Sequence, residues 1–460
     1  MGIESKLESL QKAKEAALES KAMKRLQLLF DEGTFVEIDA LAKSGEVLAE
    51  AVAGFGAVDG CPVYAFAQNS DVSGGAMSKA QAAKIHKIYD LAIKTGAPVV
   101  GIFDSAGARL NEGTDMLAAY GDMLLSSNNL SGVVPQISLV LGPCLGTNAV
   151  IAASADLVVA AKRAEFGIET NGSEGPVEED AKAGLCHLVA EDEGEAIAAV
   201  RNLVTMLPSN NLSGAPITDF ADAPNAEDAL RAAAEKIASG EAAGDISAFV
   251  ADAESFVELQ KGFGSAVTAG LAKLGGGTVG MLFFNGAYID ADSCDKAARL
   301  IRFCDAFAVP VVSFVDAPCF ASLRQASKLS NAYSEATTVK VTVVTGAAYG
   351  PVYVAVAGRG ANADLTLAWP SAAISALAPE TAAVLLWSDR LKGSTDPVAD
   401  RQKLVAEYKE TEASPEHAAA AGYVEDIIDP ADTRAKLIAA LDMLAGKRVT
   451  RLPKKHANIQ

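Results

Sequence analysis

The chain has 460 residues, half of them hydrophobic and 6% aromatic, and its formal net charge at pH 7 is −19. This charge argues against nucleic acid and anionic membranes as partners, because both are themselves negatively charged. No apolar run approaches the roughly 20 residues that a membrane-spanning helix needs, and the charged N-terminal stretch does not resemble a signal peptide. We therefore expect a cytoplasmic protein of two or three domains.

The predicted elements form two successive units in which strands alternate with helices. Residues 1–28 are predicted to form a leading amphipathic helix, followed by a first unit at 29–206. Residues 207–250, rich in Pro, Asn and Asp and then in Ala and Glu, are predicted to connect it to a second unit at 251–460. Strand–helix–strand alternation implies parallel strands with right-handed crossovers, and so an α/β fold. Strands are predicted at 61–69, 98–104, 136–142 and 156–161, and then at 278–285, 310–316, 340–346 and 352–358.

Four sequence marks of the first unit return in the same order in the second. Such long-period self-similarity is hard to obtain by chance and indicates a tandem duplication of one α/β unit. The spacing between paired marks shrinks along the chain, so the second copy has lost residues in its connections. The first three pairs are DEGTFVEI (31–38) with DAESFVEL (252–259), GFGAVDGCPV (54–63) with GLAKLGGGTV (270–279), and APVVGIFDSAG (97–107) with VPVVSFVDAPC (309–319).

The fourth pair of marks is an apolar strand that runs into Gly-x-x-x-Gly. The first copy ends in GPCLG at 142–146, and the second ends in GAAYG at 346–350. A buried strand entering a glycine turn leaves backbone N–H groups free at the turn and at the start of the following helix. Such groups can hold a developing oxyanion. Two such turns predict one enzyme that stabilises two oxyanions.

The cysteine and histidine content argues against a metal site. The six cysteines include no Cys-x-x-Cys pair, and the chain has only four histidines. Free, reduced thiols in a cytoplasmic protein are the simpler interpretation, and we expect no bound metal. Cys144 lies beside the first glycine turn, but no histidine is near it in sequence, so we do not expect it to act as a nucleophile.

The chain resembles the carboxyltransferase subunit of biotin-dependent acyl-CoA carboxylases and decarboxylases, of the propionyl-CoA carboxylase beta and methylmalonyl-CoA decarboxylase alpha type. This resemblance implies a tandem duplication of two crotonase-like (ClpP/crotonase) domains. It also implies a homo-oligomer built from dimers, which we expect to be a hexamer. The stretches that carry it are LFDEGTFVEID, GGAMSKAQAAKI, DSAGARLNEG, SGVVPQISLVLGPCLG, IDADSCDKAARLIRFCDAF, AYSEATTVKVTVV and LPKKHANIQ.

The resemblance further implies the reaction and its participants. A carboxyl group would move between biotin, carried on a separate carrier protein, and a small acyl-CoA (acetyl- or propionyl-CoA, or malonyl- or methylmalonyl-CoA). The implied partners are a biotin carboxyl carrier protein and either a biotin carboxylase or a membrane decarboxylase subunit. The reaction creates negative charge on the thioester oxygen and on the biotin ureido oxygen, so each oxygen needs its own donors.

The same resemblance assigns residues to the two expected holes. The thioester oxyanion is placed at the amides of Gly146 and Thr147. Because proline has no N–H, the biotin hole is expected to have at most one of its usual donors. Pro351→Gly is therefore expected to raise biotin-dependent turnover. The residues implied at the biotin hole are Gly350, Pro351, Val352 and Tyr353.

Further residues lie close in sequence to these motifs. Arg109 is expected either to meet a CoA phosphate or to form a salt bridge with Glu112 or Asp115. Asp104 and Asp316, each at the end of a predicted strand, are expected to be turn or cap residues rather than catalysts. The resemblance places four residues along the approach of the acyl-CoA, namely Gly74, Gly75, Ala106 and Gly107.

Two hypotheses from other functional classes remain open. One is a degenerate, non-catalytic paralogue that keeps the oligomeric scaffold, because the segments after Phe166 and around DAPCFASLRQASK are shorter than the family pattern. The other is a biotin-independent acyl-CoA hydratase or decarboxylase of the crotonase type. In that case Glu169 would be its acid/base group, with a pKa raised by desolvation.

Overall fold

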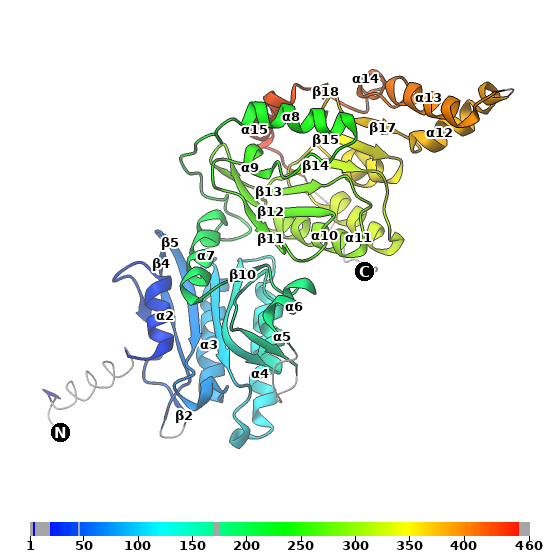
Figure 1. Ribbon diagram of the computed structural model, residues 1–460. Coiled ribbons are helices and arrows are strands. Elements are labelled where there is room, and N and C mark those ends of the chain that lie inside the picture. Colours follow the sequence, from blue (N-terminus) through cyan, green and yellow to red (C-terminus); the bar gives the residue numbers. More distant parts are fainter. Residues whose placement is uncertain (1–2, 5–18, 45–46, 169–174, 393, 450–460) are drawn as a thin grey trace. The chain divides into compact units, whose positions relative to one another are not determined.

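The computed structural model describes residues 3–4, 19–44, 47–168, 175–392 and 394–449. It divides into two compact units, Met1–Pro216 and Ile217–Gln460, each built on an eight-stranded sheet (Figure 1). Among the described helices, none is both long and apolar enough to cross a membrane.

The sheet of the first unit is antiparallel at one edge and parallel elsewhere. The pairs β1/β4 and β4/β5 are antiparallel, and β9 pairs with the end of β7 outside the main strand order. The main order is β1 (Val36–Glu37), β4 (Ala51–Val58), β5 (Cys61–Gln68), β6 (Val99–Ser105), β7 (Gln136–Leu145), β8 (Leu157–Ala161) and β10 (Leu188–Ala190), with β9 at Glu165–Gly167 and a separate ribbon of β2 (Lys43–Ser44) and β3 (Val47–Leu48).

The helices of the first unit begin and end where the sequence supplies caps. Helix α3 (Lys79–Thr95) starts after Ser78, whose hydroxyl accepts the Gln81 N–H, and stops at Gly96 in the left-handed conformation. Its buried face packs on the sheet through Ile85 and Ile88. The others are α2 (Lys21–Leu29), α4 (Asp115–Leu130), α5 (Thr147–Ala153), α6 (Val177–Lys182) and α7 (Glu193–Met206), with the short 3-10 turns η1 (Ser73–Gly75) and η2 (Leu110–Glu112).

The second unit repeats this strand order. Its sheet runs β11 (Val257–Leu259), β12 (Val267–Leu274), β13 (Gly277–Phe284), β14 (Val311–Ala317), β15 (Lys340–Tyr349), β16 (Leu365–Ala368) and β18 (Asp426–Ile427), with β17 (Ala373–Ser375) paired to the end of β15. Its helices are α8 (Ala226–Ser239), α9 (Ser247–Val250), α10 (Ala291–Ala306), α11 (Leu323–Glu335), α12 (Pro379–Leu386), α13 (Pro397–Glu410), α14 (Pro415–Ala420) and α15 (Thr433–Leu444), with η3 (Tyr353–Ala357), η4 (Arg359–Ala361), η5 (Ser388–Leu391) and η6 (Pro430–Asp432).

The duplication is confirmed at the level of single hydrogen bonds. Asp31 accepts both N–H groups of the β4/β5 turn and pairs with Arg201 of α7 at 2.9 Å. Asp252 likewise accepts both N–H groups of the β12/β13 turn and pairs with Arg434 of α15 at 2.9 Å. The aspartates that open DEGTFVEI and DAESFVEL therefore return because each anchors a hairpin turn to the last helix of its unit.

One predicted strand of the second unit is wrong. Residues 352–358 do not form a strand; they contain the π-helical turn η3, and the sheet continues with β16 instead. Gly350 has φ +44°, which turns the chain at the end of β15, and Pro351 suits the first position of the helix that follows. Burial of Ala355 and Val356 then stabilises a helical face, against the β propensity of the valines.

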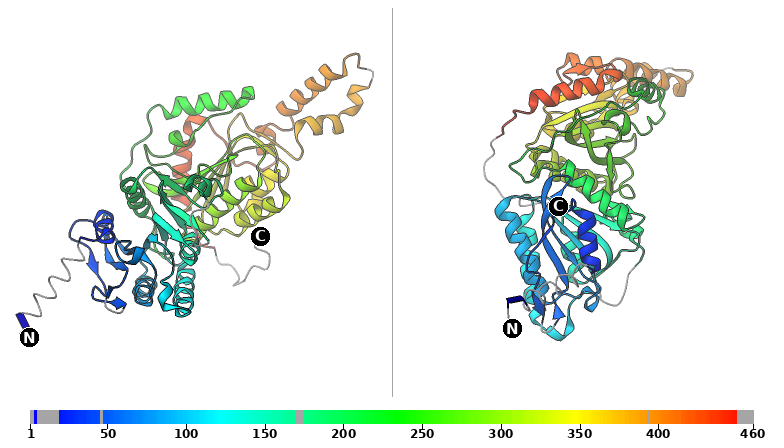
Figure 2. Two further views of the ribbon diagram at one scale, coloured as in Figure 1. Left: turned by 60° about the horizontal axis from the view of Figure 1, so that its bottom comes forward. Right: turned by 90° about the vertical axis from the view of Figure 1, so that its left-hand side faces the viewer.

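The segments predicted outside the two units contain helices of their own. Within the predicted leading helix at 1–28, the structure describes α2, which starts after the N-cap Ser20. The predicted connection at 207–250 contains α8 and α9, and α8 packs on the core of the second unit through Leu230 and Ala233. In the second unit, the pair α12 and α13 projects from the sheet around a small core of its own, centred on Leu404 and Tyr408 (Figure 2).

Candidate active site

Three connections of the first unit meet at one edge of its sheet. They follow β5, β6 and β7, whose carboxyl ends lie side by side because these strands are parallel. Ala106 donates its N–H to the Gly74 carbonyl at 3.1 Å, and the Met77 N–H reaches the Gly107 carbonyl at 2.8 Å. The structure therefore brings together the four small residues that the sequence placed along an acyl-CoA approach, Gly74, Gly75, Ala106 and Gly107.

Gly74 and Gly75 are required for different reasons, one conformational and one also steric, so the same substitution can be compared at the two positions. Both Gly74 and Gly75 have positive φ, but a Cβ at Gly75 would lie 2.3 Å from the Asp104 carbonyl oxygen, whereas one at Gly74 would meet only the Ala106 methyl at 3.7 Å. We expect Gly74→Ala to cost about 1–2 kcal/mol of unfolding free energy, the penalty for left-handed backbone. Gly75→Ala should cost clearly more, since backbone must also move. Equal losses in urea unfolding would contradict this close approach.

The first glycine turn leads directly into helix α5. Gly146 has φ +63°, and its N–H donates to the Gly167 carbonyl at 2.7 Å, which closes the β7/β9 pairing. The amide of Gly146 is therefore already engaged. Among the described residues, none accepts a hydrogen bond from the N–H of Thr147 or Asn148. These are the first two amides of the helix, and they are the free donors of this turn.

A buried polar network holds the start of α5 in place. The Asn148 amide donates to the Ser105 hydroxyl at 3.0 Å and accepts from Gln68 at 3.4 Å, and Gln68 also donates to Gln81 at 3.1 Å. All four side chains are fully buried. They tie α5 and α3 to the carboxyl ends of β5 and β6. The sequence interpretation missed this network, whose only signal is isolated polar residues within otherwise apolar segments.

Asp104 is part of a buried ion-pair cluster and does not cap a turn. Its carboxylate accepts from the Arg25 guanidinium at 2.6 Å and from the Ser70 hydroxyl at 2.9 Å. Arg25 also pairs with Glu193 at 2.7 Å. The three charged groups join α2, β6 and α7 beneath the candidate site. A sequence pattern could not indicate this cluster, because its members are far apart along the chain.

Arg109 has a different partner from those predicted. It pairs with Glu50 at 2.6 Å, and the fully buried Glu50 carboxylate also accepts from the Ser78 hydroxyl at 2.5 Å. Neither Glu112 nor Asp115 forms the expected salt bridge with it. Arg109 therefore neutralises a buried carboxylate at the site edge, and its contact with a CoA phosphate stays a prediction.

The second glycine turn repeats the geometry of the first. Gly350 donates its N–H to the Ser375 carbonyl at 2.8 Å and closes the β15/β17 pairing, as Gly146 does for β7/β9. Pro351 is exposed and has no N–H to donate. Val352 is fully buried, and no described residue accepts a hydrogen bond from its N–H. Val352 thus has the buried, unpaired amide of this turn.

Tyr353 is fixed to the chain rather than free at the turn. Its hydroxyl donates to the Tyr423 carbonyl at 2.5 Å, and burial raises its pKa to about 12. It is therefore a neutral donor near pH 7. Cys144, beside the first turn, is fully buried, and burial raises the pKa of its thiol, so the thiol stays protonated and inert. Glu169, the predicted acid/base alternative, lies outside the described residues.

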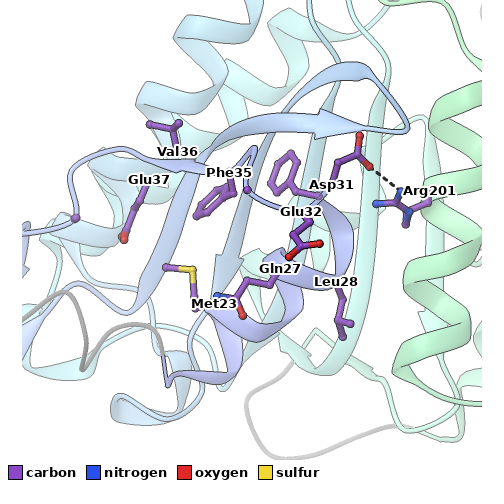
Figure 3. A pocket seen from close by; sticks show the side chains of 12 residues that line it. Met23, Gln27, Leu28, Asp31, Glu32, Phe35, Val36, Glu37 and Arg201 are labelled. Carbon is purple, nitrogen blue, oxygen red and sulfur yellow. Dashed lines mark hydrogen bonds and ion pairs between the residues drawn. The ribbon is translucent and has the colours of Figure 1, made fainter.

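A hollow of about 1010 Å³ lies elsewhere in the first unit, between α2 and the segment that leads into β1 (Figure 3). Met23, Phe35 and Val36 contribute apolar surface, and Asp31 and Arg201 form their ion pair at its rim. None of the predicted site residues lines it. Size alone therefore does not mark the candidate site, which is identified by its free amides.

Comparisons with known proteins agree with the fold and with the expected family. The family model described as "Carboxyl transferase domain" matches residues 16–459. The methylmalonyl-CoA decarboxylase subunit alpha of Veillonella parvula is 36% identical, covering 95% of this chain and 92% of the relative. The methylmalonyl-CoA carboxyltransferase 12S subunit of Propionibacterium freudenreichii subsp. shermanii is 34% identical, covering 95% of this chain and 91% of the relative.

A solved structure shows the same architecture. The transcarboxylase 12S hexamer, with hydrolysed methylmalonyl-coenzyme A bound, matches with a TM-score of 0.89 at 32% identity and covers 100% of this chain and 99% of the other. The α/β fold with two crotonase-like domains, expected from the sequence, is confirmed.

Proposed function

This chain belongs to the carboxyl transferase domain family, and we propose that it moves a carboxyl group between biotin and a small acyl-CoA such as propionyl-CoA or its carboxylated form, methylmalonyl-CoA. The observation that carries the proposal is the repeated turn, in which Gly146 and Gly350 make the same closing hydrogen bond and leave the next amides free. The names of the relatives support the substrate class. Neither alternative, the inert scaffold or the Glu169-dependent hydratase, has comparable support.

In this proposal, the first turn binds the thioester oxygen. With the thioester oxygen at the start of α5, the N–H groups of Thr147 and Asn148 can both donate to it. When the carboxyl group leaves the α-carbon, the electrons of the broken C–C bond move onto this oxygen and form an enolate. The two amides then bind a full negative charge more strongly than the neutral carbonyl, which lowers the barrier.

In this proposal, the second turn binds the ureido oxygen of biotin. Biotin, when present, supplies the ureido nitrogen that accepts or gives up the carboxyl group. The buried N–H of Val352 fits this role, because an unpaired amide gains from an acceptor such as the ureido oxygen. Gly350 has a positive φ of +44°, which glycine adopts without strain, and the exposed Pro351 adds no donor. We propose that the biotin arrives on a separate carrier protein.

The proposed reaction also implies an oligomeric state, partner subunits and a cellular location. We propose a homo-oligomer, supported by the hexamer of the matching transcarboxylase structure. A biotin carboxylase or a membrane decarboxylase subunit would complete the reaction. A cytoplasmic location is supported by the six cysteines, which the structure shows as free thiols.

The proposal is tested by decarboxylation of malonyl-CoA and methylmalonyl-CoA with and without free biotin. Turnover that depends on biotin is expected. Turnover without biotin that is lost in Glu169→Ala would support the hydratase-type alternative. A well-folded oligomer with no turnover on either substrate would instead favour the inert scaffold.

Pro351→Gly is expected to raise biotin-dependent turnover by about tenfold or more, because it restores one N–H at the second turn. The measurement is the steady-state rate at saturating acyl-CoA and varied biotin. Pro351→Ala serves as a companion variant, since it restores the same donor without the flexibility of glycine. A rate gain with Gly but none with Ala would attribute the effect to flexibility and count against the missing donor.

A further inference from the structure

The internal duplication provides a matched comparison for two acidic side chains. Asp104 lies near the end of β6 and Asp316 near the end of β14, the corresponding strands of the two units. Each carboxylate packs on a glycine of the next strand, so a Cβ at Gly142 would lie 2.4 Å from Asp104 Oδ1, and one at Gly346 would lie 2.3 Å from Asp316 Oδ1. Both carboxylates therefore point to the same face of their sheets.

The two carboxylates differ in how their charge is balanced. Arg25 of α2 pairs with Asp104, as described above. Among the described residues, the Asp316 carboxylate accepts only the Ala347 N–H, at 2.8 Å, and no Lys, Arg or His nitrogen lies within 4.0 Å of it. The arginine of α8, Arg231, is committed to Asp429 at 2.9 Å. Burial raises the pKa of Asp316, as expected for a carboxylate without a cationic partner.

The space beside Asp316 is a cavity of about 270 Å³, and three phenylalanines form part of its lining. Phe283 and Phe314 stack at 4.8 Å on its lining, whereas the residues at the same register in the first unit are Ala67 and Ile102. The cavity shares Asp316 and other lining residues with a second hollow of about 570 Å³. This second hollow gives a ligand a route to the carboxylate.

We infer that this cavity binds a small organic cation, a guanidinium or primary ammonium group, which pairs with Asp316 as Arg25 pairs with Asp104 in the first unit. Aromatic faces attract such cations. The lining also contains Asp245, whose carboxylate already accepts the N–H and the hydroxyl of Ser247, so Asp316 is the carboxylate left for a ligand. A divalent metal is disfavoured, because the described residues contain no group of three or more His, Cys, Asp or Glu side chains placed to hold one. Neither the biotin ring nor the pantetheine arm of CoA carries such a cation, so this ligand is separate from the proposed substrates.

The test is calorimetric titration of the full chain with n-propylguanidinium, using n-propylurea as the neutral isostere. We expect saturable binding of the guanidinium and none of the urea. Asp316→Asn keeps an acceptor for the Ala347 N–H, but it should weaken binding by about tenfold or more, since a charge-assisted bond is lost. Asp389→Asn, at an exposed carboxylate, is the control and should bind as the wild type does.

A second pair of variants keeps the inference testable if Asp316→Asn does not fold. Ile237 of α8 lines the cavity, so Ile237→Arg can supply the cation from within the chain. This variant should abolish binding of the probe and raise the melting temperature, whereas Ile237→Met should do neither. Equal affinity for the guanidinium and the urea, or unchanged affinity in Asp316→Asn or Ile237→Arg, would overturn the inference. The readout is binding alone, so it is independent of carboxyl transfer.

Discussion

Replacing Thr147 by proline is expected to lower kcat/KM for the acyl-CoA by about 10²–10³-fold, the usual cost of removing one oxyanion donor. The substitution removes one of the two free amides at the start of α5. The fold should tolerate it, because proline is favoured at the first position of a helix and the second turn carries Pro351 at the corresponding place.

Thr147→Ala is the matched control, since it removes the exposed side chain but keeps the N–H. It should retain turnover close to that of the wild type. Circular dichroism and the oligomeric state of the proline variant establish that it is folded. If the alanine variant lost as much activity as the proline variant, the threonine hydroxyl and not the backbone would carry the effect, and the amide mechanism would be wrong at this turn.

Replacing Arg25 by alanine is expected to cost about 3–5 kcal/mol of the unfolding free energy of the first unit, the range for removing one partner of a buried ion pair. Arg25 is 3% exposed. Its removal leaves the Asp104 carboxylate buried without a cationic partner, and Glu193 loses its hydrogen bonds to the guanidinium. Urea unfolding of the wild type and the variant measures the loss.

Arg231→Ala provides the comparison for an exposed pair. The side chains of Arg231 and Asp429 are both exposed, so water and salt screen their attraction, and the loss there should be much smaller than in Arg25→Ala. Similar losses for the two variants would show that the Arg25 cluster does not hold the first unit together. The cluster would then also be a poor reference for the unpaired Asp316.

The sequence predicted the features that depend on local patterns. Apolar runs, glycine turns and repeated marks were enough to predict the duplicated α/β units. The family resemblance placed Gly74 and Gly75 at the same site as Gly107. The aspartates of DEGTFVEI and DAESFVEL show why the repeat was visible, since each must anchor a hairpin turn. The family followed from the same marks and is confirmed by the match over residues 16–459.

What the sequence could not predict depends on contacts between distant segments. Gly146 was expected to be a free donor, but the three-residue strand β9 takes its N–H, and so short a strand has little periodicity to recognise. The partner of Arg109 is Glu50, which is 59 residues away. The predicted strand at 352–358 failed because alternating valines outweighed the helix-start signal of Pro351 after a glycine.

If the two backbone turns act on one carboxyl group, that group can be followed from the acyl-CoA to biotin. Purified protein is incubated with free biotin and methylmalonyl-CoA or malonyl-CoA that is radiolabelled in the free carboxyl group, and the biotin fraction is then isolated under alkaline conditions. Label bound to biotin is the predicted result, and it should fall sharply in Thr147→Pro but not in Thr147→Ala. Loss of the label from the acyl-CoA at the same rate with and without biotin, with none on biotin, would show that the protein does not transfer the carboxyl group to biotin.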